Sequence, residues 1–472
     1  MTQAKRKPPV SRKARKQAVL QLVLLTGIEP VWCCHRGILS LVLVLVMVAG
    51  LAACGGGGTS GAGSSTPAEP AGSQGSGEGY ELTMWLFQDW TVGTAAEIFN
   101  TWADEYIAQH PEVKSITFVG KPDTEIVSGF MAGGSLPDMF AIQFLNGKRI
   151  VESANILNLQ PYYDAAPEEY KNALNADAMK DLMTNPEGTC WGLPFTANCQ
   201  LLYRNLTVLE ACGVDTSKRP ETLDELLEQF AAVQENGYDV LPNLTASDWV
   251  TSAFVCGNPD LKVGWENGET TITAEALEPG YELLKEVGQY SAAYTFLDQA
   301  ATDAFTSDKL AFTVHGPFLN PNLEAAAQEN SNFKYDAIPM PSQVAGGPYS
   351  ASYGNEWLGV VDSGDQGRND AAAGFLMYIT DTEQMKTFCR EMGRPVMNND
   401  AMDEIANDPE SPWLLSVCNE IVNNCVNQAV PFRCDMMWET GCADSMFGLW
   451  DGSLTDAKAA AEDSIAMINE NA

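Results

Sequence analysis

Short apolar runs alternate with amphipathic stretches from the first third of the chain to its end. Residues 82–87 form an apolar run that is typical of a buried strand. Apolar side chains at helical spacing follow over residues 98–107, and His110 and Pro111 end this pattern. Residues 115–119 are apolar and β-branched again, so a strand, a helix and a second strand are predicted in succession. This order predicts an α/β sheet with right-handed crossovers.

The same alternation continues along the rest of the sequence. A helix is predicted before Gly133, and a capping box from Thr222 to Glu225 opens another helix that ends at Asn236 and Gly237. Further strands are predicted at residues 138–142, 200–203, 310–314, 333–338 and 357–361, and further helices at residues 370–380, 383–391 and 456–469. Because the chain shows no internal repeat and is too long for one sheet, the pattern predicts two α/β lobes.

Length and charge narrow the class of function. The 472 residues are 45% hydrophobic, which suffices for a sizeable core and for two or three domains. Residues 1–53 hold eight of the 27 basic residues and one acid, Glu29, so the rest of the chain carries 19 basic against 61 acidic side chains. This acidic balance repels nucleic acid and anionic lipid surfaces, and it disfavours phosphate or nucleotide partners.

The cysteines do not follow a metal-binding pattern. Nine of the twelve come after Cys54, and they are Cys190, Cys199, Cys212, Cys256, Cys389, Cys418, Cys425, Cys434 and Cys442. Their spacings lack the close pairs of zinc sites, and the chain has only three His, so we expect neither a metal nor a cofactor. One or two disulfides and a full set of free thiols are both compatible with the sequence.

An export signal is predicted before the globular part. Residues 38–50 form an apolar run that is shorter than the roughly 20 residues a membrane-spanning helix needs. The run ends at Ala52, Ala53 and Cys54, which resembles the lipobox of bacterial lipoproteins. Residues 1–53 are therefore predicted to be a signal peptide, and Cys54 is predicted to carry the lipid.

Two neighbouring segments complete this amino-terminal region. Residues 18–28 are a second apolar stretch that ordinary signals lack, and it makes the part before the lipobox unusually long. A gene start placed too far upstream and a second membrane-inserted stretch both explain it. Residues 54–79 consist mainly of Gly, Ser, Ala, Pro and Thr, so we expect a lipidated Cys54 followed by a flexible tether.

Four blocks of sequence carry a family resemblance. They are residues 82–90 (LTMWLFQDW), residues 133–140 (GGSLPDMF), residues 192–195 (GLPF) with 201–205 (LLYRN) and 220–222 (PET), and residues 311–318 (AFTVHGPF) with 338–341 (IPMP) and 373–376 (AGFL). In this order behind a lipobox, they resemble the extracellular solute-binding proteins of family 1, the maltose and oligosaccharide type. The chain departs from the family pattern at Arg204 and Asn205, where Asn-Lys is usual, and at Phe318, where Trp is usual.

This resemblance implies a fold and a role. The fold is the two-lobe, type II periplasmic-binding-protein fold of the α/β class, with a ligand cleft between lobes joined by hinge strands. Residues 80–195 plus 340–364 would form the N-terminal lobe, and residues 196–339 plus 365–472 the C-terminal lobe. The protein would not be an enzyme. It would be a monomeric substrate-binding lipoprotein on the outer face of the cytoplasmic membrane, capturing a sugar or oligosaccharide for the permease of an ABC importer.

A sugar site needs flat aromatic rings for C–H groups, and amides, carboxylates or guanidinium groups for hydroxyls. The chain supplies both types after predicted strands, where α/β proteins bind their ligands. The candidate substrate-binding residues are Gln88, Asp89, Trp90, Gln143, Phe195, Asn198, Trp249, His315, Phe318, Asn355, Trp357, Arg394 and Trp438. A place in the core is the alternative for Trp90, Trp249, Trp357 and Trp438, a hydrogen-bonded structural role is the alternative for His315, and an ion pair is the alternative for Arg394.

Other functions stay open at this point. Asp89 and Glu356 are carboxylates that suit a polyamine, and a peptide or another polar solute is a related alternative. An exported carbohydrate-active enzyme would need two carboxylates at a set separation, which abundant acids allow. The chain contains no G-x-S-x-G or H-E-x-x-H motif and no evident Cys/His pairing, so we expect binding rather than catalysis.

Overall fold

The computed structural model describes residues 79–143, 146–182, 189–266, 269–427 and 441–470. The predicted signal peptide 1–53, Cys54, all of the tether except its last residue, and Trp438 lie outside the described residues, as does the side chain of Asn355. Within the described ranges, no helix has the length and apolar character to cross a membrane. All eight cysteines in these ranges are free thiols.

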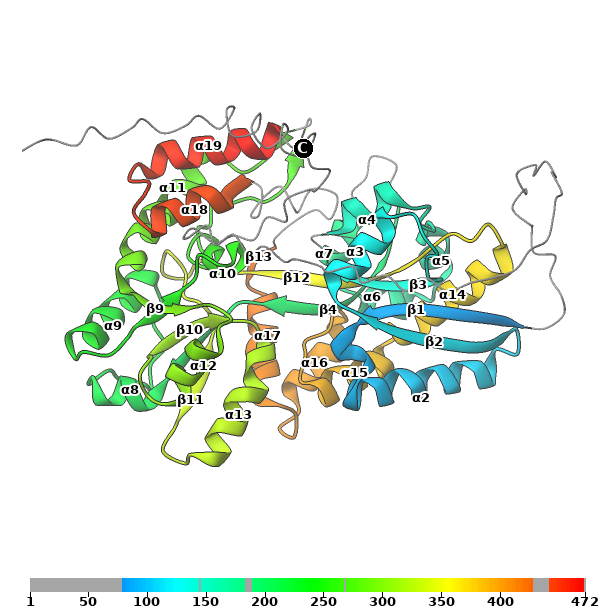
Figure 1. Cartoon of the computed structure of the whole chain (residues 1–472), viewed down its shortest axis with the longest axis horizontal. Coiled ribbons are helices and arrows are strands. Elements are labelled where there is room, and N and C mark those ends of the chain that lie inside the picture. The colour runs from blue at the N-terminus through cyan, green and yellow to red at the C-terminus, as the bar shows by residue number, and fades with distance from the viewer. Residues whose placement is uncertain (1–78, 144–145, 183–188, 267–268, 428–440, 471–472) are drawn as a thin grey trace, which may run out of the picture. The chain divides into compact units, whose positions relative to one another are not determined.

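A six-stranded mixed sheet forms the first part of the fold (Figure 1). Its strands are β1 (Tyr80–Phe87), β2 (Val113–Lys121), β3 (Met139–Gln143), β4 (Leu193–Cys199), β12 (Tyr349–Val360) and β13 (Cys425–Asn427). The order is β13-β12-β3-β1-β2, with β4 also paired to β12. Strand β1 is parallel to both neighbours, whereas β12 is antiparallel to β3 and β4. The predicted strand, helix and strand at the start of this sheet are confirmed.

Helices pack on this sheet and bury their apolar faces in what we call the first core. They include α2 (Gly93–Gln109), α3 (Asp123–Met131), α4 (Gly147–Ser153), α5 (Gln160–Ala165), α6 (Glu168–Ala173), α7 (Ala176–Leu182), α14 (Gln366–Ile379), α15 (Thr382–Met392) and α16 (Asn399–Asn407). In α2, Phe99 and Trp102 are buried at helical spacing, as the pattern predicted. Trp85 of β1 is partly buried against the same core.

The first core contains helices from the segment that was predicted for the C-terminal lobe. Residues 365–472 were all expected in the C-terminal lobe, but Phe375, Phe388 and Ile405 of α14, α15 and α16 lie in the core of the first sheet. Their apolar faces pack there because α14 contacts β1 and β12 and α15 contacts α2. Periodicity predicted α14 and α15 but not α16, and it carries no information about which sheet a helix covers. The predicted boundaries stay predictions.

A second set of strands begins directly after β4. Strand β5 (Leu201–Asn205) is antiparallel to β10 (Phe312–His315) and to β11 (Tyr335–Ile338), while β6 (Leu241–Asn243) is parallel to β9 (Ser291–Thr295). A short hairpin joins β7 (Trp265–Glu266) to β8 (Glu269–Thr270). The other helices of the fold are α8 (Leu206–Ala211), α9 (Leu223–Glu235), α10 (Asp248–Ser252), α11 (Ala274–Val287), α12 (Gln299–Thr306), α13 (Asn320–Glu329), α17 (Trp413–Val422), α18 (Ala443–Trp450) and α19 (Ala457–Glu470). Single 3₁₀ turns lie at η1 (Gln88–Thr91), η3 (Gly288–Tyr290) and η4 (Pro317–Leu319).

Local signals placed the helix ends well. The Thr222 hydroxyl accepts a hydrogen bond from the Glu225 N–H at 3.3 Å, as predicted, although the Glu225 carboxylate reaches the Glu221 N–H rather than that of Thr222. Gly393 ends α15 in the left-handed region, with φ of +59°. Strand β12 begins at Tyr349, eight residues before the predicted 357–361, because its polar Ser and Asn side chains hide the strand pattern in the sequence.

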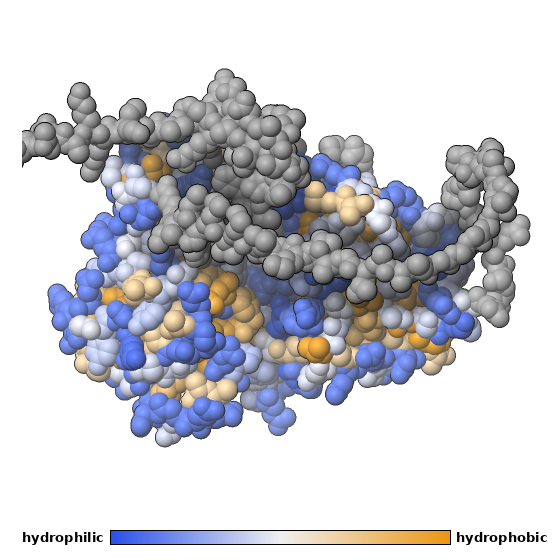
Figure 2. Space-filling model, viewed as in Figure 1, coloured by the Kyte–Doolittle hydropathy of each residue, from blue (hydrophilic) through white to orange (hydrophobic). Residues whose placement is uncertain are grey.

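The two strand sets are joined by buried polar groups as well as by the backbone. Gln200 is the single residue between β4 and β5, and it is fully buried. Its side-chain amide donates to the Trp249 carbonyl at 2.7 Å, and its amide oxygen accepts from the Ser352 N–H of β12 at 2.7 Å. Hydrophilic residues cover most of the described surface that is visible in Figure 2, in keeping with the acidic composition.

Candidate functional site

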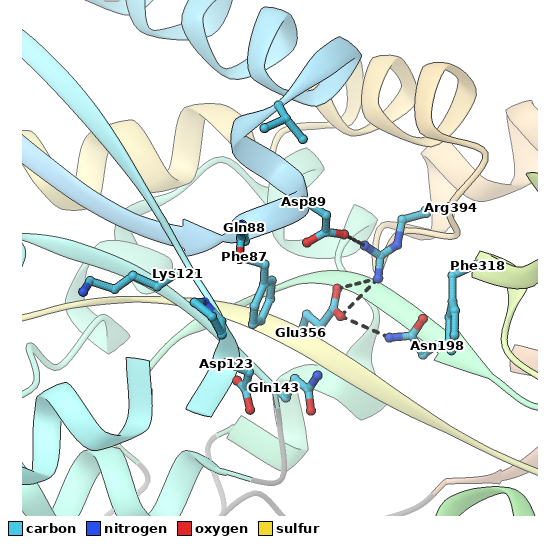
Figure 3. Close-up of a pocket in the computed structure, with 12 residues that line it drawn as sticks. Phe87, Gln88, Asp89, Lys121, Asp123, Gln143, Asn198, Phe318, Glu356 and Arg394 are labelled. Atoms are coloured by element: carbon cyan, nitrogen blue, oxygen red, sulfur yellow. Dashed lines mark hydrogen bonds and ion pairs between the residues drawn. The ribbon is translucent and has the colours of Figure 1, made fainter. Parts of the chain in front are cut away.

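A pocket of about 610 Å³ opens where β1, β2 and β3 end (Figure 3). It is lined by Phe87, Gln88, Asp89, Val92, Lys121, Pro122, Asp123, Gln143, Asn198, Phe318, Glu356 and Arg394. Parallel α/β sheets present such pockets at the carboxyl ends of their strands, because the following loops meet there. Six residues predicted from sequence are brought together: Gln88, Asp89, Gln143, Asn198, Phe318 and Arg394. Their role in binding stays a prediction.

One side of the pocket is a charged network, which we call the polar wall: Asp89, Asn198, Glu356 and Arg394. One terminal nitrogen of Arg394 lies 3.1 Å from each Glu356 carboxylate oxygen, and the other lies 3.6 Å from Asp89. The Asn198 amide donates to Glu356 at 3.1 Å, and the Thr196 hydroxyl donates to the same carboxylate. Figure 3 shows Arg394 between the two carboxylates. Because each group holds the others, this wall is set before any ligand arrives.

The backbone explains why these side chains converge. Side chains alternate along β12, so Glu356 faces the pocket while its neighbour Trp357 enters the first core. The left-handed turn at Gly393 ends α15 and lets Arg394 reach Glu356. The guanidinium carbon of Arg394 lies 5.6 Å above the centre of the Trp90 ring. Buried Trp90 therefore supports Arg394 through a cation–π contact.

Three buried polar atoms at the pocket lack a hydrogen-bond partner among the described residues. They are Arg394 Nε, Asn198 Oδ1 and Asp123 Oδ1. The first is a donor and the other two are acceptors, so together they suit a ligand that both donates and accepts. Hydroxyl groups do both. Buried groups of this kind are paired in most proteins, which makes a bound polar ligand the natural partner.

The residues after β2 also line the pocket, and sequence reasoning missed them. Asp123 opens α3 and accepts from the Asn146 amide at 2.9 Å, and Lys121 lies 4.5 Å from the centre of the Trp85 ring. Burial raises the pKa of the Asp123 carboxyl above its usual range. The sequence could have indicated them. Gln88 and Gln143 were chosen because ligands bind at the carboxyl ends of strands, and the same rule applies to the end of β2.

The pocket is also lined by an exposed aromatic ring, that of Phe318. Phe318 follows β10 in the turn η4, and 45% of its surface is exposed. Its ring packs edge-on against His315 at 4.7 Å between centres, and His315 lies 4.8 Å from Phe296. His315 itself is 7% exposed, and burial lowers its pKa to about 4. It therefore supports Phe318 as a neutral side chain and does not line the pocket, and its contact with a ligand stays a prediction.

Three further candidate residues are buried in the structure. Trp90 and Phe195 are fully buried in the first core, where their rings contact each other at 5.4 Å, and Trp357 is 1% exposed. No ring face is left to stack on a sugar. A side chain added at Gly192 would overlap the Trp357 ring, so the backbone there is shaped around this tryptophan.

The remaining candidates stay predictions. Trp249 on α10 is partly buried against the core that surrounds β6, β10 and α11, and it is not among the residues that line the pocket. The backbone of Asn355 pairs with Ala197 in the sheet. Among the described residues, no cluster of three or more His, Cys, Asp or Glu is placed to bind a metal ion.

Comparison with known proteins now identifies the family. Residues 101–412 match the family described as bacterial extracellular solute-binding protein, which is more than half of the chain. The chain belongs to this family. Its members bind a small solute outside the cytoplasm for an ABC transporter and are not catalytic, so this solute-binding protein is not an enzyme.

Solved structures support the fold. The cyclic α-maltosyl-1,6-maltose binding protein from Arthrobacter globiformis is 18% identical, with a TM-score of 0.68 over 84% of this chain and 100% of that chain. A maltose-binding periplasmic protein from Listeria monocytogenes in complex with maltose is 18% identical, with a TM-score of 0.64 over 84% and 98%. A maltotriose binding protein from Thermus thermophilus is 16% identical, with a TM-score of 0.61 over 83% and 99%. The periplasmic-binding-protein fold predicted for this solute-binding protein is confirmed.

Proposed function

We propose that this solute-binding protein captures an oligosaccharide in the pocket described above and delivers it to the permease of an ABC importer. The observation that carries the proposal is that an exposed Phe318 ring and the polar wall line the same pocket. A pyranose has C–H faces that pack on a ring and hydroxyls that donate and accept hydrogen bonds. The pocket offers both kinds of surface within a volume suited to a few sugar units.

The charges in the pocket favour a neutral ligand over a polyamine. Arg394 pairs with both Asp89 and Glu356, so these two carboxylates share one positive charge. Lys121 adds a second positive charge at the same pocket. A polyamine would need several uncompensated carboxylates enclosed by rings, whereas the three carboxylates that line this pocket stand against two cations, Lys121 and Arg394. The neighbouring solved structures, whose titles describe binding of maltose, maltotriose or a cyclic maltosyl sugar, point the same way.

The proposal includes the attachment to the membrane. Cys54 follows a lipobox-like sequence, and a Gly- and Ser-rich segment separates it from β1. A lipid on Cys54 would hold the protein at the outer face of the cytoplasmic membrane, within reach of its permease. The tether would let the binding domain move while remaining attached.

Calorimetry and thermal unfolding test the sugar proposal. Maltose, maltotriose, maltotetraose and a cyclodextrin are compared with spermidine and a short peptide. A true ligand above its Kd raises the unfolding midpoint, since it binds the folded state only. Phe318→Ala is expected to weaken sugar binding by about 1 to 2 kcal/mol, because one stacking face is lost.

Trp413→Ala is the matched control, since Trp413 is 42% exposed and does not line the pocket. It should leave affinity unchanged. A midpoint that rises with spermidine or peptide, and with none of the sugars, would overturn the proposal.

A further inference from the structure

Leu297 occupies a backbone conformation that leucine rarely adopts. It lies in the turn between β9 and α12 with φ of +71°. The Asp298 N–H donates to the Thr295 carbonyl at 3.0 Å, so Leu297 is the third residue of a β-turn. This position of a turn with positive φ is normally filled by Gly or Asn, because a Cβ is crowded there.

The Leu297 side chain is also exposed to 67% of its surface. Packing of this side chain inside the protein therefore compensates little of the backbone strain. Among the described residues outside glycine, only Leu297 and Asp308 have positive φ. Strain that the fold does not use is a frequent mark of a functional position.

The strand order places Leu297 at the ligand edge. β6 and β9 run parallel, and β6 also runs parallel to the start of β10 through the bridge of Asp239 to Leu310. The carboxyl ends of these three strands therefore meet at one edge. Phe318, which lines the pocket, follows β10 at that same edge.

Leu297 is connected to Phe318 indirectly, through its neighbour in sequence and His315. Its neighbour Phe296 packs on His315, and His315 packs on Phe318. Leu297 and His315 line the same narrow cavity. Leu297 does not line the main pocket, but the narrow cavity places it beside His315, which packs against Phe318. We call Leu297, His315 and Phe318 the apolar edge.

We propose that Leu297 is a specificity-determining residue that extends the binding site beyond Phe318 and favours longer oligosaccharides. This inference rests on the proposed function. A sugar unit beyond the one on Phe318 would place its C–H groups on the Leu297 side chain. A disaccharide held between the polar wall and Phe318 would not reach it. The turn keeps the Leu297 side chain exposed, so a ligand that covers its apolar surface would gain binding free energy.

The test compares Leu297→Asn with the wild type on maltose and maltotetraose, and on cellobiose and cellotetraose, by calorimetry. Asn tolerates positive φ and lacks the apolar side chain. The expected result is an unfolding midpoint at or above that of the wild type, with tetrasaccharide affinity reduced about tenfold and disaccharide affinity changed less than twofold. Loss of affinity without loss of stability is an outcome that general damage to the fold would not produce.

Asp308→Asn is the matched control, because Asp308 also has positive φ but precedes β10 at the other end of the strand. It should leave both affinities unchanged. If the wild type binds a tetrasaccharide and Leu297→Asn binds it equally well, this inference fails while the proposed function stands. If the wild type binds none of the four sugars, both fail.

Discussion

The polar wall and the apolar edge are built on opposite principles. In the polar wall, Glu356 is 5% exposed and accepts hydrogen bonds from three side chains, so its geometry is complete without a ligand. In the apolar edge, Leu297 and Phe318 are exposed, and Leu297 has a strained backbone. The comparison teaches that one side of the site is preorganised by the fold, while the other gains its stabilisation when apolar surface is covered.

The largest expected effect concerns the support of the polar wall. Trp357 is next to Glu356 on β12 but packs edge-on against Phe140 in the first core. Trp357→Ala should therefore lower the free energy of unfolding by about 4 kcal/mol, because a large cavity is left. Urea unfolding of the variant measures this loss. Trp413→Ala, which removes a half-exposed ring, should cost far less. Equal losses would mean that Trp357 is not a core residue.

A smaller effect is expected within the polar wall itself. Glu356→Ala should lower the free energy of unfolding by about 3 kcal/mol, because Arg394 is left largely buried with Asp89, at 3.6 Å, as its remaining carboxylate. Urea unfolding and sugar calorimetry on the same variant separate lost stability from lost binding.

Glu81→Ala is the control for this variant. Glu81 also pairs with a cation, Lys114 at 2.6 Å, but both side chains are more than half exposed. No measurable change is expected there. If Glu356→Ala unfolds with the same free energy as Glu81→Ala, the polar wall is no more preorganised than an ordinary surface ion pair.

The smallest effect concerns the apolar edge and depends on pH. His315 has its pKa lowered to about 4 by burial, so the unfolded chain binds a proton more readily than the folded chain between pH 6.5 and 4. Stability is therefore lost as the pH falls through this window, by about 2 kcal/mol between pH 7 and pH 5. The measurement is the free energy of unfolding at both pH values.

His315→Leu removes this contribution. The difference between pH 7 and pH 5 should shrink by that amount in the variant, whatever its absolute stability. The same pH dependence in both proteins would show that His315 is not the buried, neutral support of Phe318.

The sequence by itself determined several of the elements, the α/β class, the family resemblance and the loops that carry the site. Periodicity and caps report local geometry, which is why α9 and α15 were predicted nearly to the residue. Gln88, Gln143 and Phe318 were chosen because ligands bind after the ends of strands, and all three line one pocket.

Only the tertiary structure decided which aromatic rings are buried and which polar groups are paired. Trp90 and Trp357 have polar neighbours in sequence, yet adjacent residues on a strand or turn point in opposite directions, so a polar neighbour does not make a ring exposed. The pairing of Glu356 with Arg394 joins residues 38 positions apart, and the strain at Leu297 depends on one backbone angle. Neither leaves a periodic signal in the sequence, because both arise from contacts that form only when distant segments pack together.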